Sequence, residues 1–138
     1  MLNFTSRFGR RAARRLRQEK VIWLTTTDSH NTPQPRPVWF HWDGRTVLIF
    51  SEKHAAKLRH IAHNPRVALN FNSDEDGDDV VVLIGEARIL SKPPAASRVN
   101  TYLRKYRLGI TDIDMTVPQF AAAFAVPILV TPKTMRGH

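Results

Sequence analysis

The sequence predicts a mainly β protein with helices, an α+β fold in which a small antiparallel barrel has helices over its openings. Three observations support this prediction: short segments rich in β-branched residues alternate apolar and polar side chains, tight turns join most of them, and the helical segments occur singly among the strands. The order predicts six strands and about four helices. The six glycines are scattered, so the sequence lacks the glycine-rich fingerprint of a dinucleotide-binding fold.

Local signals predict each element of the first half of the chain. Apolar residues at helical spacing predict the first helix, β-branched residues predict the next strand, and Asp43–Gly44 is typical of a two-residue hairpin turn. The predicted elements are, in order, a basic helix near Phe4–Gln18, a strand Val21–Thr27, a turn Asp28–Asn31, a strand Thr32–Phe40, a strand Thr46–Ser51 and a helix from about Lys53 to His63.

Prolines delimit the elements of the second half. Asn64–Pro65 predicts the end of the preceding helix, because a residue before proline avoids the helical conformation, and Pro93–Pro94 and Pro118 predict helix starts. The predicted elements are, in order, a strand Val67–Asn72, an acidic loop Asp74–Asp79, the longest strand Val80–Leu90, a helix from Pro93 to about Arg107, a short helix Pro118–Ala125 and a closing strand Val126–Thr131.

Positive charge is concentrated at the N-terminus. The chain carries 21 Lys and Arg and a net charge of +9, and residues 1–20 hold seven of these cations with one acid, Glu19. Such a helix could pack on a barrel end, touch anionic lipid or bind a polyanion. The predicted organisation is a basic amphipathic helix at 1–20, a barrel domain at 21–132 and a C-terminal tail at 133–138.

Composition excludes several classes of protein. Without cysteine, the chain has neither disulfides nor thiolate chemistry. No apolar run approaches the roughly 20 residues of a membrane-spanning helix and nothing resembles a signal peptide, so we expect a soluble, cytoplasmic protein. A chain of 138 residues is small for an enzyme that must enclose a cofactor alone, so we expect a site shared between two copies.

The segment TPQPRPVWF, residues 32–40, has an unusual spacing of prolines. Pro33, Pro35 and Pro37 recur with the period of an extended chain, so one side of this strand lacks three successive N–H donors. A strand of this kind must run along an edge, a bulge or a crevice. Trp39 and Phe40 follow it and point to opposite faces, so one of them is expected in the barrel core.

A second segment supplies positive charge where a phosphate would need it. Ser51 is predicted at or just before the N-cap of the helix that begins near Lys53, and Lys53 and Lys57 are predicted one turn apart on one face of that helix. Helix N-termini present free N–H groups that suit an anion. Alone, these residues would indicate a capped helix with solvated lysines. Beside the proline strand, they predict a phosphate clamp next to a docking strand for a flat ring.

Three further groups of residues give weaker signals. His60 and His63 stand three apart on a helix, but no carboxylate with ligand spacing lies nearby, so surface histidines are predicted and no metal site. The loop Asp74–Asp79 lacks the glycine and glutamate positions of a calcium loop and is predicted to be solvated. His41 beside Asp43 could form a base and its orienting group, although adjacent residues rarely arrange in this way.

The order of these segments resembles the pyridoxamine 5′-phosphate oxidase-like split-barrel superfamily, and within it the branch that uses the deazaflavin coenzyme F420. The resemblance runs from about Val21 to Thr131 and includes TPQPRPVWF, the DG turn, IFSEKHAAKLRHIAHNPRVALNFN at 49–72 and VVVLIGEARIL at 80–90. It implies a six-stranded antiparallel split barrel of the FMN-binding type. It also implies a homodimer with cofactors at the interface, so that residues 21–132 form a cofactor-binding domain.

The resemblance also implies roles for individual residues. The flat ring of the cofactor is expected against the strand residues Arg36, Pro37, Val38 and Trp39, with Phe50 at the end of the neighbouring strand. The ribityl phosphate is expected at Ser51, Lys53, Ala56 and Lys57. The cofactor supplies the redox chemistry in this family, so no residue is assigned as a general acid or base and none as a metal ligand.

The resemblance thus implies an F420-dependent oxidoreductase that transfers hydride between the reduced cofactor and a small planar electrophile such as a quinone or enone. FMN is the alternative cofactor, with oxidase or reductase activity, and haem ranks third. A flavin- or deazaflavin-binding carrier without fast turnover is a second class of function. The expected partners are a second copy of the chain and a small-molecule electron acceptor. Nucleic acid is not expected, and weak contact of the N-terminal helix with an anionic membrane is left open.

Overall fold

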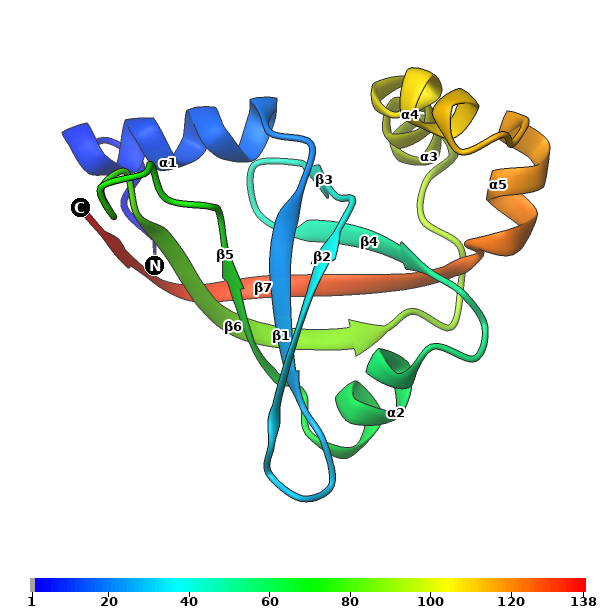
Figure 1. Cartoon of the computed structure of the whole chain (residues 1–138), viewed down its shortest axis with the longest axis horizontal. Coiled ribbons are helices and arrows are strands. Elements are labelled where there is room, and N and C mark those ends of the chain that lie inside the picture. The colour runs from blue at the N-terminus through cyan, green and yellow to red at the C-terminus, as the bar shows by residue number, and fades with distance from the viewer. Residues whose placement is uncertain (1) are drawn as a thin grey trace.

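A computed structural model describes residues 2–138 of the chain; residue 1, the first of the predicted basic segment, lies outside the described residues. Within this range one antiparallel sheet of seven strands, in the order β2-β1-β5-β6-β7-β4-β3, curls into a split half-barrel (Figure 1). The strands are β1 Ile22–Thr27, β2 Pro33–Val38, β3 His41–Trp42, β4 Val47–Ser51, β5 Arg66–Asn70, β6 Val81–Ile89 and β7 Val126–Gly137.

Five helices in residues 2–138 accompany the sheet, and Figure 1 shows them at separate places around it. One lies across an end of the barrel, one lies near the β1–β2 hairpin, and three gather beside β4. We call these last three the helical cap. The helices are α1 Arg7–Gln18, α2 Ala56–His63 and, in the cap, α3 Ala96–Lys105, α4 Arg107–Asp112 and α5 Val117–Ala123.

Alternating side chains of the strands form the interior of the barrel, as the sequence pattern predicts. In β1 the residues Ile22, Leu24 and Thr26 are buried while the residues between them are partly exposed. We call the resulting cluster the barrel core; it comprises Ala12, Leu16, Ile22, Leu24, Phe40, Val47, Ile49, Ile61, Val67, Leu69, Phe71, Val81, Leu83, Ala87, Ile128 and Val130. Phe40 is fully buried there and Trp39 is not, which confirms that one of the aromatic pair belongs to the core.

The basic helix α1 packs on the barrel end, one of the three possibilities that the sequence left open. Ala12 and Leu16 on its inner face are fully buried in the barrel core. Arg15 is also buried, and its guanidinium donates to the carbonyl oxygen of Asn72 at 2.8 Å and to that of Asp79. One arginine of this helix is therefore a structural tie to the loop at the end of β5.

The proline strand β2 lies at an edge of the sheet, which confirms the prediction from its missing donors. It pairs only with β1 among the described strands, with Trp23 opposite Pro37 and Leu24 opposite Arg36. Because a proline cannot donate, the ladder bonds from β2 must come from the residues between the prolines. The outer side of β2 therefore offers carbonyl groups without N–H partners.

The structure corrects several predicted boundaries. The short segment His41–Trp42 is a strand paired with β4, so the described sheet has seven strands where six were predicted. The longest strand is β7, not the segment Val80–Leu90, because β7 continues to Gly137 along β6. The predicted tail at 133–138 is therefore part of the sheet up to Gly137. The cap and the other two helices make five helices in residues 2–138 where about four were expected.

Polar contacts join the helical cap to the barrel. The hydroxyl of Tyr106, at the junction of α3 and α4, accepts from the backbone N–H of Phe40 at 2.8 Å and lies 2.7 Å from the carbonyl oxygen of Lys20. Lys105 donates to the carbonyl oxygen of Phe40 at 2.9 Å. The apolar side of the cap forms a second, smaller cluster of Tyr102, Tyr106, Ile110 and Phe120.

Candidate functional site

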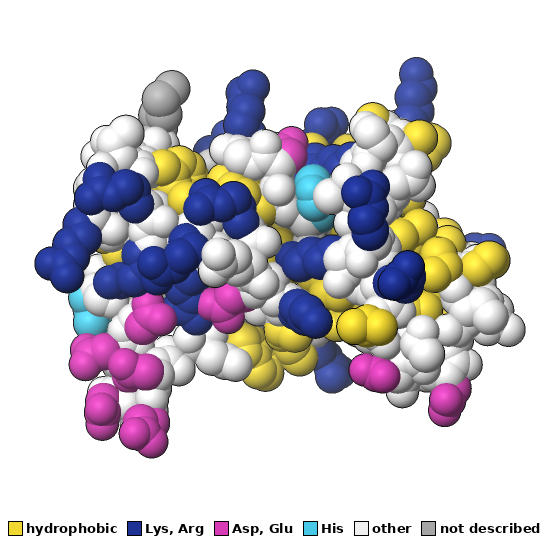
Figure 2. Space-filling model, turned by 90° about the horizontal axis from the view of Figure 1, so that it is seen from above, with side chains coloured by type: hydrophobic (Ala, Val, Ile, Leu, Met, Phe, Trp, Pro, Cys, Tyr) yellow, Lys and Arg dark blue, Asp and Glu magenta, His cyan; other side chains and the backbone are white. Residues whose placement is uncertain are grey.

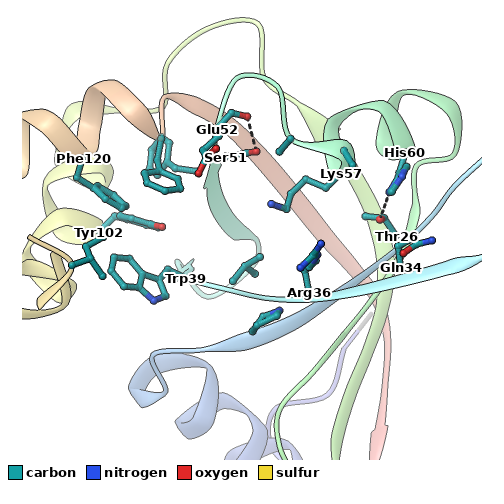
Figure 3. Close-up of a pocket in the computed structure, with 17 residues that line it drawn as sticks. Thr26, Gln34, Arg36, Trp39, Ser51, Glu52, Lys57, His60, Tyr102 and Phe120 are labelled. Atoms are coloured by element: carbon teal, nitrogen blue, oxygen red, sulfur yellow. Dashed lines mark hydrogen bonds between the residues drawn. The ribbon is translucent and has the colours of Figure 1, made fainter. Parts of the chain in front are cut away.

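A cavity of about 530 Å³ lies between the edge strand β2, the end of β4, the start of α2 and the helical cap (Figure 3). Its volume falls within the range of small-molecule sites. The residues that line it are Thr26, Gln34, Arg36, Pro37, Val38, Trp39, Phe50, Ser51, Glu52, Ala55, Ala56, Lys57, His60, Tyr102, Ile113, Phe120 and Phe124.

Two cations face each other across the middle of this cavity. Arg36 points inward from β2, and Lys57 points inward from the first turn of α2 (Figure 3). Burial lowers the pKa of Lys57, the Arg36 guanidinium lowers it further, and the carboxylate of Glu52 acts in the opposite direction. An anion placed between the two cations would reverse their mutual repulsion, so this part of the cavity suits a phosphate or carboxylate.

Hydrogen-bonding side chains line the cavity beyond Lys57. The Nδ1 atom of His60 lies 2.8 Å from the hydroxyl of Thr26, which is buried in β1 (Figure 3). The amide of Gln34 donates to Asp28 at 3.0 Å. The backbone N–H of Thr32, this amide and the backbone N–H of His30, in that order, lower the pKa of Asp28. The β1–β2 turn thus orients Gln34 at the rim.

Aromatic side chains line the end of the cavity opposite His60 and Gln34 (Figure 3). Trp39 stacks on Tyr106 with ring centroids 4.6 Å apart and planes inclined by 1°, and on Phe120 at 5.4 Å. Tyr102 meets Phe50 edge to face at 4.8 Å. These contacts hold the Trp39 ring between β2 and the helical cap, so the wall that it presents is apolar and fixed in orientation.

One glycine of the cap limits the position of this wall. A Cβ atom on Gly109 of α4 would lie 3.2 Å from two ring carbons of Trp39. This distance is shorter than an ordinary van der Waals contact, so a larger residue would push the indole ring toward the cavity or away from its stack.

The segment between β4 and α2 differs from the prediction. The N-cap of α2 is Ala55, so the helix begins at Ala56 and Lys53 lies before it. Ser51 is buried, pairs with Val126 of β7 and donates its hydroxyl to the carbonyl oxygen of Glu52 at 2.9 Å. Ser51 is therefore not a helix cap, and the prediction that Lys53 and Lys57 share a helix face is wrong.

The structure brings together all but one of the nine residues predicted to bind a cofactor. The cavity is lined by Arg36, Pro37, Val38, Trp39, Phe50, Ser51, Ala56 and Lys57. Lys53 is exposed and does not line it. The contacts of these residues with a cofactor stay a prediction.

Sequence reasoning missed the contribution of distant segments to this cavity. Tyr102, Phe120 and Phe124 come from the helical cap, and their local pattern indicates only amphipathic helices. His60 was predicted to lie at the surface, yet it lines the cavity. Its place one turn after Lys57, at i+3 on the same helix, is the signal that could have identified it.

Another of the weaker candidates, the pair His41 and Asp43, lies outside the cavity. His41 and Asp43 both meet Arg98 of α3, which donates to His41 Nδ1 at 2.9 Å and pairs with Asp43 at 3.2 Å. Burial, followed by the charge of Arg98, lowers the pKa of His41. The pair is therefore part of a tie between the cap and the β3–β4 hairpin. Among the described residues, no three His, Asp or Glu side chains gather closely enough to hold a metal ion.

Helix length and polarity also bear on membrane insertion. None of the helices within residues 2–138 is both long and apolar enough to cross a bilayer.

Comparisons with known proteins agree with this architecture. A structure of a provisionally named pyridoxamine 5′-phosphate oxidase from Listeria innocua matches with a TM-score of 0.71 and 21% identity over 92% of this chain and 94% of that one. A structure described as an F420 reductase matches with a TM-score of 0.67 and 23% identity over 88% and 92% of the two chains. HutZ, described as a heme storage protein from Vibrio cholerae, matches at 0.72 and 13% identity over 96% and 95%.

A search of curated protein sequences found no match. The sequence profile of the pyridoxamine 5′-phosphate oxidase family, in contrast, matches residues 8–125, which include both β2 and α2. The chain therefore belongs to the pyridoxamine 5′-phosphate oxidase family and has its split-barrel fold.

Proposed function

We propose that this protein is an F420-dependent oxidoreductase that transfers hydride between the reduced deazaflavin and a small planar electrophile. The main supporting observation is the shape of the cavity, which joins two facing cations, Arg36 and Lys57, to a flat aromatic wall at Trp39. A phosphate linked to a flat tricyclic ring has matching chemistry at its two ends. The likeness to a structure described as an F420 reductase supports the same choice.

The residues present fit such a cofactor. Arg36 and Lys57 would hold its phosphate through charge-assisted hydrogen bonds, with His60 and Gln34 as further donors beside them. Trp39 and Val38 would support one face of the ring. When bound, the deazaflavin supplies the hydride chemistry at its central ring, so the protein needs to provide position and electrostatics.

The chain's own contribution is to bind and orient. The paired cations fix the anionic end, and the Trp39–Tyr106–Phe120 stack excludes water from the ring end. No residue is assigned a proton transfer. FMN also presents a phosphate and a planar tricyclic ring, so an FMN-dependent oxidase or reductase is an alternative, and a carrier without turnover is another. Both are outcomes of the experiment below.

We also propose that two copies of the chain share the site. The cavity opens beside the edge strand β2, where Arg36 and Pro37 are exposed and the outer carbonyl groups have no strand partner. A second copy packed there would close the opening. Sedimentation equilibrium should then show a dimer, and a monomer that binds cofactor at full affinity would contradict this proposal.

Titration of the purified protein with oxidised F420, FMN and haem, followed by quenching of tryptophan fluorescence, tests the choice of cofactor. Trp39 lies at the ring end and should report binding directly. Micromolar binding of F420 with much weaker FMN and haem binding is the expected result. Stronger FMN binding would assign the FMN branch, and stronger haem binding would contradict a hydride-transfer function. Turnover of a quinone panel with reduced F420 then separates an enzyme from a carrier.

Substitution of Lys57 tests the placement of the phosphate. Lys57→Gln should weaken F420 binding by roughly ten- to a hundredfold, because a charge-assisted contact worth about 1.5–3 kcal/mol is lost. Lys53→Gln is the matched control, since this lysine lies outside the cavity and should leave affinity within about twofold. Equal losses in both variants would show that long-range charge, and not a phosphate clamp, governs binding.

A further inference from the structure

Arginines are arrayed along the outer face of α1, and they are independent of the cavity. Arg7, Arg10, Arg14 and Arg17 are exposed and follow one another at spacings of three or four residues, so they share one face of the helix over about 15 Å. The opposite face, with Ala12 and Leu16, is buried in the barrel core. We call the four residues the arginine row.

No ion pair among the described residues neutralises the charge of the arginine row. Within residues 2–138 the carboxylates that pair with α1 reach its other two arginines: Asp79 meets Arg11 at 3.0 Å and Arg15 at 3.4 Å, and Glu19 meets Arg15. The helix itself has no acidic residue in its first turn. The positive potential of the row is therefore directed outward.

The positive face continues onto the helical cap. Both α1 and the cap lie on the upper side of the barrel in Figure 1, and the view of that side in Figure 2 shows Lys and Arg side chains over both halves, with acidic side chains mostly at the margins. Lys20 follows α1 and is joined to the cap through the hydroxyl of Tyr106, 2.7 Å from its carbonyl oxygen. Arg104 and Arg107 of the cap are exposed.

An apolar side chain stands among these cations. Leu108 of α4 is 69% exposed, directly follows Arg107 and lies one turn after Arg104. An exposed leucine within a broad basic face is typical of proteins that rest on the headgroups of an anionic bilayer and insert a side chain between them. A single-stranded nucleic-acid site usually has exposed aromatic side chains on which the bases stack. In α1, as the structure describes it, no aromatic side chain is exposed.

We propose that this face, the arginine row with Lys20, Arg104, Arg107 and Leu108, docks on an anionic phospholipid bilayer. The apolar side of α1 is already buried in the barrel, so α1 does not insert. The row binds headgroup phosphates electrostatically, and Leu108 supplies a shallow apolar anchor. The proposal uses no residue that lines the cavity and stands or falls apart from the proposed function.

Vesicle flotation with the full chain tests the proposal. Vesicles containing about one-third phosphatidylglycerol should bind the protein at about 0.1 M salt, and pure phosphatidylcholine vesicles should not. The quadruple variant Arg7→Gln, Arg10→Gln, Arg14→Gln and Arg17→Gln should lose at least about tenfold in partitioning. Glutamine keeps the helix propensity of these exposed positions, and circular dichroism checks the fold.

A second quadruple variant controls for total charge. Arg59→Gln, Arg66→Gln, Arg88→Gln and Lys92→Gln remove as many exposed cations from outside α1 and the cap and should change partitioning by less than about threefold. Equal losses in the two variants would overturn the proposal, as would equal binding to neutral vesicles.

Leu108→Ser separates a bilayer from a nucleic acid. This change should reduce vesicle binding several-fold, and it should leave any binding to a short DNA duplex unchanged. If the duplex binds more tightly than the vesicles at the same salt and Leu108→Ser affects neither, the face serves a nucleic acid and the proposal is wrong.

Discussion

The barrel core and the helical cap are built from different side chains and held by different forces. The barrel core is largely aliphatic, its residues are at most 4% exposed, and most of them lie on strands that are paired with neighbours in the sheet. The cap cluster is mostly aromatic, and some of its partly buried neighbours, among them Trp39 and Phe50, line the cavity. We therefore expect the barrel core to contribute most of the stability. The helical cap, where it meets the barrel, sets the shape of the cavity.

Polar ties connect the two regions. Arg98 donates from α3 to the carbonyl oxygens of His41 at 3.2 Å and Thr46 at 3.0 Å, and Tyr106 accepts from the backbone of Phe40. Hydrogen bonds are directional, unlike apolar contacts, so these ties set the orientation of the cap. Substitutions in the core, in these polar ties and in the cap should therefore have different effects on stability and on cofactor binding.

Removal of a barrel-core side chain should have the largest effect. Phe40 is fully buried, so Phe40→Ala should lower the free energy of unfolding by about 3–5 kcal/mol through lost burial and the cavity left behind. Urea denaturation measures this change. Leu108→Ala is the control, because a side chain that is 69% exposed should change it little. Similar losses at both positions would show that the cap is as tightly packed as the core.

Replacement of the Arg98 guanidinium should have an intermediate effect on the free energy of unfolding. Arg98→Lys keeps a charge near Asp43 but cannot satisfy His41 and Thr46 together, so we expect a loss of about 1–3 kcal/mol in the free energy of unfolding. Arg104→Lys on the same helix is exposed and should be nearly neutral. Cofactor affinity reports the orientation of the cap. If Arg98→Lys leaves this affinity unchanged, apolar packing alone orients the cap.

The pH dependence of stability should report the tie made by Lys105. Burial, with a further effect of Lys20, lowers the pKa of Lys105 to about 8, below its value in an unfolded chain. Above pH 8 the unfolded state then binds more protons than the folded state, so this residue makes stability rise with pH from about 8 toward 10. Lys105→Met should flatten that slope in urea titrations. An identical slope in both proteins would show that Lys105 titrates normally.

A change at Gly109 should have the smallest effect on stability and the clearest effect on the site. Gly109→Ala improves helix propensity by about 0.5–1 kcal/mol, but its Cβ would approach the Trp39 ring to 3.2 Å. We expect an unfolding free energy within about 1 kcal/mol of the wild type and cofactor affinity reduced several-fold. Thr111→Ala, at an exposed position of α4, is the control. Unchanged cofactor affinity in Gly109→Ala would show that α4 does not determine the position of the Trp39 ring in the cavity wall.

Much of the site could be predicted because its charged half is local in sequence. The prolines of β2 place it at an edge, and Arg36, Trp39 and Lys57 lie within a segment whose strands and helix have clear signals. The start of α2 could not be predicted in this way. Ser51 is taken up in the pairing of β4 with β7, a strand more than seventy residues later, and so it cannot cap the helix.

By itself the sequence determined the alternating barrel core, the edge position of the proline strand and the cationic part of the cavity, because each depends on residues close together in the chain. Only the tertiary structure decided the aromatic wall, the tie from Arg98 to His41 and Asp43, and the extension of β7 to Gly137. These features join segments that are far apart in sequence. Local periodicity specifies which side of an element is apolar, but not which distant element it meets.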